Sequence, residues 1–417
     1  MRVILLFVWM FSAWGAFANH ILIPMDASQS NHLKAYGVAY HALKKGYEIQ
    51  WLLNYRGGSF VLPFDAEGRT ECLLKGVSFE VIPPARLQSI LAEIALPEVN
   101  ADAVKLEKAP KIAVYSPKEK KPWDDAVTLA MTYAEIPYDV VYDSEIMDGR
   151  LKEYDWLHLH HEDFTGQMGK FYRNYRHMDW YRREEAANKQ TAQKYGYAKI
   201  SELKKAVVRK IRDFVANGGF MFAMCSATDT FDIALAAMEV DICDVMFDGD
   251  PADPNAQEKL DYSQTFAFKD FQLVMNPNVY EYSDIDVTET RKVGEKEDYF
   301  LLFDFSAKWD PVPTMLCQNH ENMIKGFMGQ TTAYKRSLIK SNVLIMGENK
   351  VAGEARYIHG EYGKGTWSFF GGHDPEDYQH FVGDPVTELD LHKQSAGYRL
   401  ILNNILFPAA KKKQHKT

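Results

Sequence analysis

The chain has 417 residues, of which 46% are hydrophobic and 25% are charged, so its composition is that of an ordinary globular protein. Its formal net charge of −9 provides no basic surface of the kind that binds phosphate backbones, which argues against nucleic acid as a partner. The length exceeds what one small core needs and predicts two domains, or one large domain with insertions.

The first 18 residues predict a secretory signal peptide. Arg2 supplies a positive n-region, residues 3–11 form an apolar segment, and Ala16-Phe17-Ala18 is a small-x-small cleavage pattern. We therefore expect cleavage before Asn19 and a periplasmic or secreted mature protein. No later apolar run approaches the roughly 20 residues of a membrane span, so no transmembrane segment is expected after cleavage.

Four cysteines would then meet an oxidising compartment: Cys72, Cys225, Cys243 and Cys317. Four cysteines allow three disulfide pairings, and the sequence does not choose among them. A disulfide through Cys225 stays open as an alternative to a reactive thiol at that position.

Residues 19–105 predict a small N-terminal α/β unit. Residues 20–24 and 47–53 are expected to be strands flanking a helix over 31–45, as in a βαβ opening. The glycine-containing segment 54–60 lacks a P-loop lysine and is expected to be a turn. Residues 98–110 are polar enough to predict a linker.

Residues 111–410 predict a larger α/β domain. Strands are expected at 111–115, 138–142, 154–159 and 219–224, with helices at 122–133 and 200–217, and later strands precede a helix at 394–406. Alternating strands and helices favour a mostly parallel sheet covered by helices on both faces. Ligands of such sheets bind beyond the carboxyl ends of the strands.

Residues 218–229 have the pattern of a nucleophile elbow, in which a strand, a tight turn carrying the reactive side chain and a helix follow one another. An apolar strand ends on Cys225, and a helix-like segment follows. Ala223 and Ala227 keep the turn small enough for strand and helix to approach each other. Cys225 is therefore a candidate nucleophile.

A thiol nucleophile needs a base and a group that orients the base. His373 follows a predicted strand and is the expected base, and Glu376, three residues later, is the expected orienting carboxylate ahead of Asp374. The elbow and the late His-x-x-Glu segment together resemble the class I glutamine amidotransferase superfamily. In this chain alanines replace the glycines of that elbow, and one extra residue separates His373 from Glu376.

The resemblance implies a flavodoxin-like α/β fold over residues 111–410, with an insertion at about 244–291, and a Cys225-His373-Glu376 triad. It also implies an oxyanion site at the Ser226 amide and in the loop carrying Gly166 and Gly169. His160, His161 and Glu162 would then lie beside the elbow and contact substrate. The superfamily also contains non-hydrolytic members.

Histidines are concentrated in residues 158–163. His158, His160 and His161 offer ligands for a divalent metal, with His320 or His359 completing the shell, but their spacing matches no zinc signature. We therefore expect these histidines to line a polar cleft and expect no cofactor. The aromatic residues of 171–183 predict an amphipathic helix packed on the domain, with a lid or sugar platform as the alternative.

These patterns predict an exported cysteine-dependent hydrolase or amidotransferase-like enzyme that acts on an amide-type bond of a small-molecule, peptide or carbohydrate substrate. The alternative is a non-catalytic protein of the same fold that binds a ligand, such as a carbohydrate, or serves as a scaffold.

Overall fold

The computed structural model describes residues 19–118, 122–310 and 318–410. The predicted signal peptide and Cys317 lie outside the described residues. Cys72, Cys225 and Cys243 are free thiols. Within the described ranges, no helix combines the length and the apolar character that crossing a membrane requires.

The N-terminal unit is built on a five-stranded antiparallel sheet of order β4-β1-β3-β2-β5. Its elements are β1 His20–Ile23, α1 His32–Lys44, β2 Ile49–Leu53, β3 Ser59–Pro63, α2 Ala66–Lys75, β4 Glu80–Ile82, α3 Pro84–Ala95 and β5 Asp102–Leu106. The predicted strand, helix and strand are present, and β1 and β2 run parallel, but they are not neighbours, because β3 pairs antiparallel with both and lies between them. The predicted linker 98–110 contains β5, which pairs with β2 as an edge strand.

The second sheet has ten strands: β6 Ile112–Tyr115, β7 Asp139–Val141, β8 Trp156–Leu159, β9 Phe220–Met224, β10 Tyr299–Leu302, β11 Met323–Lys325, β12 Tyr334–Lys335, β13 Leu344–Asn349, β14 Glu354–Tyr362 and β15 Gly365–Phe370. Its helices are α4 Ala126–Ala134, α5 Asp143–Met147, α6 Tyr172–Tyr175, α7 Asp179–Lys194, α8 Ile200–Ala216, α9 Ser226–Ala236, α10 Val245–Asp248 and α11 Ala396–Leu406. The strand order is β11-β10-β13-β14-β15-β9-β8-β6-β7, with β12 beside β14.

The prediction of a mostly parallel, flavodoxin-like sheet is wrong, because the sheet is mixed. Strands β15, β9, β8, β6 and β7 run parallel to one another. The other half of the sheet, β10 to β14, is antiparallel. The physical reason lies in the connections: β13, β14 and β15 follow one another through short turns without an intervening helix, and such turns join antiparallel strands.

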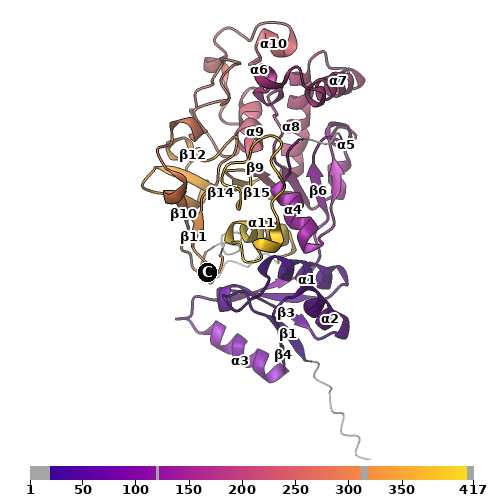
Figure 1. The fold of residues 1–417 in the computed structure, drawn as a ribbon, viewed down its shortest axis with the longest axis vertical. Coiled ribbons are helices and arrows are strands. Elements are labelled where there is room, and N and C mark those ends of the chain that lie inside the picture. The colour runs from indigo at the N-terminus through magenta and orange to yellow at the C-terminus, as the bar shows by residue number, and fades with distance from the viewer. Residues whose placement is uncertain (1–18, 119–121, 311–317, 411–417) are drawn as a thin grey trace, which may run out of the picture.

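Alternating side chains of the second sheet face two separate cores. Val114, Trp156 and Phe222 belong to one core, whereas Tyr115, Leu157 and Ala223 belong to the other. The first core continues through α1, α4 and α11 into the five-stranded sheet. Figure 1 shows α1 and α11 together at the junction of the two units. The N-terminal unit therefore packs through α1 against α4 and α11, and its core is continuous with the core on that face of the larger sheet.

Candidate active site

Cys225 lies in a strained turn between β9 and α9. Its backbone angles are φ 50° and ψ −140°, a region that costs a residue with a side chain roughly 1–3 kcal/mol. Helix α9 begins at the next residue, and the Ala227 amide donates to the His160 carbonyl oxygen at 2.9 Å. A small residue at 227 allows this close approach of α9 to the end of β8. The turn thus has the sharp geometry of a nucleophile elbow.

Four parallel strands bring the candidate residues to one edge of the sheet. β6, β8, β9 and β15 are neighbours that all end on this side. The loops after them carry, respectively, Asp124 and Asp125, His160 and His161, Cys225, and His373. The structure therefore brings together His160, His161, Cys225 and His373, each of which places one ligand atom within 4.8 Å of the others.

His373 is buried and lies between the Cys225 thiol and the Asp124 carboxylate. Its Nε2 is 3.7 Å from Asp124 Oδ1, and its exposed fraction is 6%. Burial alone would lower the pKa of His373, but Asp124 and the Cys225 thiolate together raise it to about 10. The same contact holds the pKa of Asp124 below its usual value against the opposing effect of burial. His373 is therefore poised to be an imidazolium beside a sulfur nucleophile.

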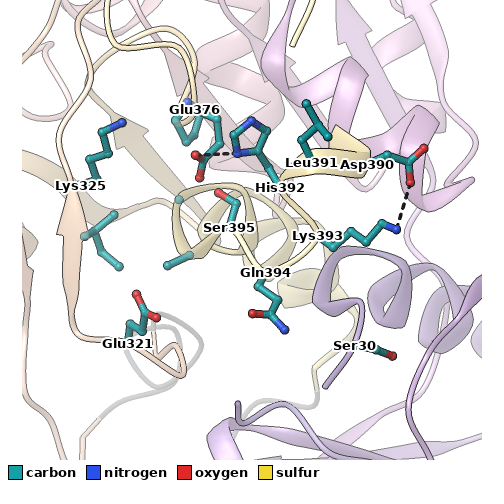
Figure 2. A pocket seen from close by; sticks show the side chains of 14 residues that line it. Ser30, Glu321, Lys325, Glu376, Asp390, Leu391, His392, Lys393, Gln394 and Ser395 are labelled. Carbon is teal, nitrogen blue, oxygen red and sulfur yellow. Dashed lines mark ion pairs between the residues drawn. The ribbon is translucent and has the colours of Figure 1, made fainter. Parts of the chain in front are cut away.

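Glu376 lies elsewhere. Its carboxylate pairs with His392 Nδ1 at 3.0 Å, in a pocket between residues 390–397 and β11, as Figure 2 shows. Asp374 fixes this arrangement, because it accepts hydrogen bonds from the Glu376 amide and the Tyr398 hydroxyl, both at 2.8 Å. The turn after His373 therefore directs Glu376 toward α11, and Asp124 is the carboxylate at His373.

A backbone amide points at the sulfur. The Gln330 N–H donates to Cys225 Sγ at 3.2 Å, and the Gln330 side chain donates to the Gly169 carbonyl oxygen at 3.0 Å. Arg356 holds the loop that carries Gln330, because it donates to the carbonyl oxygens of Phe327 and Thr332 at 2.6 and 2.9 Å. The buried amide favours negative charge on the sulfur.

Arg356 in turn depends on a buried carboxylate. It pairs with Asp298 at 2.7 Å, and Arg291 pairs with the same carboxylate at 2.8 Å. Both Arg356 and Asp298 are fully buried, so each provides the other's compensating charge. This ion-pair network positions the Gln330 loop over Cys225 from the antiparallel half of the sheet.

The predicted substrate-contacting residues divide into two groups. His160, His161 and Glu162 line a cleft of about 680 Å³ together with Trp123. Ser226 is fully buried at the start of α9 and does not line this cleft. Gly166 lines a second, smaller pocket that Trp123, His161 and Glu162 also line. Burial lowers the pKa of His160 to about 4 although Asp125 opposes it. The cleft therefore presents neutral imidazoles next to the Cys225 elbow.

The histidines proposed from sequence as metal ligands are distributed differently. His158 points away from Cys225, with Nδ1 3.2 Å from the Phe222 carbonyl oxygen and Nε2 3.0 Å from Asp125 Oδ2. His320 stacks on His32, with ring centroids 4.3 Å apart. His359 contacts the Ser368 hydroxyl at 2.8 Å. His160 and His161 are the two members that lie beside Cys225.

Sequence reasoning missed Asp124, Asp125, Gln330 and His380. The two aspartates fall in residues 122–133, which were predicted to be helical throughout, whereas α4 begins only at Ala126. Asp125 is the N-cap of α4 and accepts the amides of Val127 and Thr128. An aspartate before an apolar helical run is a common N-cap signal, and it would have placed both carboxylates in the loop after β6. His380, 3.1 Å from Asp124, had no comparable signal.

Aromatic side chains form a wall beside the cleft. The Trp123 ring lies 5.9 Å from the ring of His161, 5.5 Å from Phe171 and 5.2 Å from Trp180. Part of the aromatic run 171–183 therefore packs on Trp123 at the site, in addition to forming α6 and the start of α7.

Comparisons with known proteins leave the family open. No protein-family profile and no curated protein sequence matches the chain. Two cytoplasmic proteins of known structure from Salmonella typhimurium align with 72% of this chain and all of their own length, at 9% and 12% identity and a TM-score of 0.35. A β-galactosidase from Bacillus circulans sp. alkalophilus aligns with 65% of this chain and 29% of its own length, at 8% identity and a TM-score of 0.27. At these TM-scores the similarities support no assignment of fold family or function.

Proposed function

We propose that the protein is a cysteine-dependent hydrolase that cleaves an amide-type bond through Cys225, His373 and Asp124. The observation that carries the proposal is the strained Cys225 turn, with the sulfur beside a buried histidine that contacts a carboxylate. Nucleophile, base and orienting group in this order are the arrangement that makes a thiol reactive. Asp124 takes the role that the sequence had suggested for Glu376.

The chemistry follows from the positions of the groups. The Cys225 thiolate attacks the substrate carbonyl carbon and forms a C–S bond, and the carbonyl oxygen becomes an oxyanion. Helix α9 begins at this point, so its Ser226 amide and the positive end of its dipole stabilise that charge. His373 gives its proton to the leaving nitrogen as the C–N bond breaks. It then takes a proton from water, which attacks the thioester, releases the acid and restores the thiolate.

The path to the Cys225 sulfur limits which substrates can reach it. Cys225 is only 3% exposed, whereas His160 and His161 line the cleft and lie within 4.8 Å of the sulfur. The scissile group therefore enters past these two histidines, with Trp123 against its attached portion. A small amide, or a carboxamide at the end of a longer molecule, fits this path better than an internal bond of a folded polypeptide.

An acyl donor tests the proposal without knowledge of the natural substrate. The purified chain is mixed with p-nitrophenyl acetate, and the burst of p-nitrophenol and the site of acetylation are measured by absorbance and mass spectrometry. We expect a burst of one equivalent, acetylation at Cys225, loss of the burst in Cys225→Ala and its retention in Cys72→Ala. No burst, or a burst that survives in Cys225→Ala, contradicts the proposal and favours a non-catalytic ligand-binding protein.

A further inference from the structure

Three imidazoles and one thiol converge on a common point at the elbow. One ligand atom from each of His160, His161, Cys225 and His373 lies within 4.8 Å of the other three. Tetrahedral zinc, with bonds of about 2.0–2.3 Å, separates its ligand atoms by roughly 3.3–3.8 Å. Small side-chain rotations would therefore close this set around one ion. The chemical steps of the proposed hydrolase use only Cys225 and His373 of the four, and substrate entry past His160 and His161 does not explain why their ring nitrogens converge on the sulfur.

Each of the three histidines directs its second ring nitrogen at an oxygen. His160 Nδ1 lies 3.2 Å from Asp125 Oδ2, and His161 Nε2 lies 2.8 Å from the Asp124 carbonyl oxygen. His373 Nε2 lies 3.7 Å from Asp124 Oδ1. Metal-bound histidines almost always show this outer contact, which fixes the tautomer and turns the other nitrogen toward the metal. The inner nitrogens are then His160 Nε2, His161 Nδ1 and His373 Nδ1.

His160 supplies a further observation. Its side chain is 1% exposed, and its Nε2 is a buried atom with neither a hydrogen bond nor an ion-pair partner among the described residues. Burying a polar nitrogen without a partner is unfavourable. A metal ion at the centre of the cluster would supply that partner.

We propose that His160, His161, Cys225 and His373 bind one Zn²⁺ ion, and that the bound ion blocks the thiol. A set of three nitrogens and one sulfur suits zinc and excludes hard cations such as Mg²⁺ and Ca²⁺. All four tetrahedral positions are taken by protein, so the site is closed and leaves no position for a zinc-bound water. When zinc binds, the proton shared by Cys225 and His373 is released to solvent. The sulfur lone pair that would attack a carbonyl is then coordinated to the metal. Zinc and acyl transfer are therefore alternative states of one site.

Calorimetric titration of the chelator-treated full chain with ZnCl2 tests the site. We expect one ion per chain in the wild type and a loss of more than about 100-fold in affinity in His160→Ala. Asp125→Asn removes the charge at the outer contact of His160 but keeps a side-chain oxygen to cap α4, and it should lose about 10- to 100-fold. His392→Ala, a histidine paired with Glu376 in the separate pocket of Figure 2, is the matched control and should bind as the wild type does.

A second measurement, made on the wild type, keeps the test valid if His160→Ala fails to fold. Co²⁺ added to the wild type should give a thiolate-to-cobalt charge-transfer band that is missing in Cys225→Ser. Absence of stoichiometric zinc binding in the wild type, or equal affinity in His160→Ala, overturns the proposal. The acylation burst of the metal-free chain is measured separately: a burst without zinc binding refutes the metal site alone, and zinc binding without a burst refutes the hydrolase alone.

Discussion

Asp124 Oδ1 lies 3.7 Å from Nε2 of His373. The two residues are far apart in the chain, and they meet because β6 and β15 end on the same edge of the sheet. This contact, together with the Cys225 thiolate, keeps the pKa of the buried His373 high instead of low.

Asp124→Asn should therefore lower the pKa of His373, because the amide removes the charge that opposes the effect of burial. The measurement is an NMR titration of the His373 ring in the variant and the wild type. Glu376→Gln is the matched control, because Glu376 pairs with His392. This variant should leave the pKa of His373 unchanged. A shift in Glu376→Gln but not in Asp124→Asn would restore Glu376 as the orienting group.

The raised pKa of His373 also predicts how stability depends on pH. Its value of about 10 exceeds the ordinary 6.5, so the folded state binds the proton more tightly than the unfolded state does. The resulting stabilisation is complete below pH 6.5 and is lost as pH rises from 6.5 through about 10. The free energy of unfolding in urea is measured for the wild type and His373→Gln at pH 6 and at pH 10. The difference between the two proteins should be larger at pH 6. An equal gap at both values contradicts the proton-linked contact.

The backbone strain at Cys225 predicts that the glycine variant at this position is more stable than the alanine variant. Glycine tolerates φ 50° and ψ −140° better than alanine does, so Cys225→Gly should be about 1 kcal/mol more stable than Cys225→Ala. Cys72, buried inside α2, is the control, because glycine costs about 1 kcal/mol relative to alanine in a helix. Urea denaturation of the four variants should give opposite orders at the two positions. The same order at both would show that the Cys225 turn is unstrained.

The buried carboxylate that supports the Gln330 loop should be costly to remove. Asp298→Asn leaves Arg356 buried with its charge uncompensated and should destabilise the fold by about 3–5 kcal/mol. Asp284→Asn, which breaks a partly exposed pair with Lys335, should change stability by less than about 1 kcal/mol. The free energy of unfolding in urea measures both. Similar small losses would mean that the Arg356 network does not stabilise the fold.

Local signals in the sequence predicted local structure well. The apolar run after Gly219 and the small residues around Cys225 correctly indicated a strand, a tight turn and a helix. His160 and His161 were expected beside the elbow, and their position after β8 brings them there. These features depend on neighbouring residues, which a sequence pattern records directly.

Features that depend on distant pairing were predicted poorly. The antiparallel half of the sheet was missed although the short turns between β13, β14 and β15 indicate antiparallel pairing. β10, in contrast, pairs with β11 and β13 across longer loops, whose lengths do not set strand direction. The residues of β5 predict a linker from sequence because, at a sheet edge, polar side chains alternate with the buried ones. Glu376 and Asp374 were the expected carboxylates because they follow His373 closely in sequence. The turn fixed by Asp374 directs Glu376 away, and the carboxylate beside His373 is that of Asp124, which is distant in the chain.

The central claim is that His373 activates Cys225, and the rate of alkylation by iodoacetamide as a function of pH tests it most directly. The rate constant at Cys225 is followed by mass spectrometry in metal-free wild type and His373→Gln. At pH 7 we expect the wild type to react about 10-fold faster or more, because the buried His373 imidazolium stabilises negative charge on the sulfur. Superimposable pH profiles for the two proteins would contradict the account.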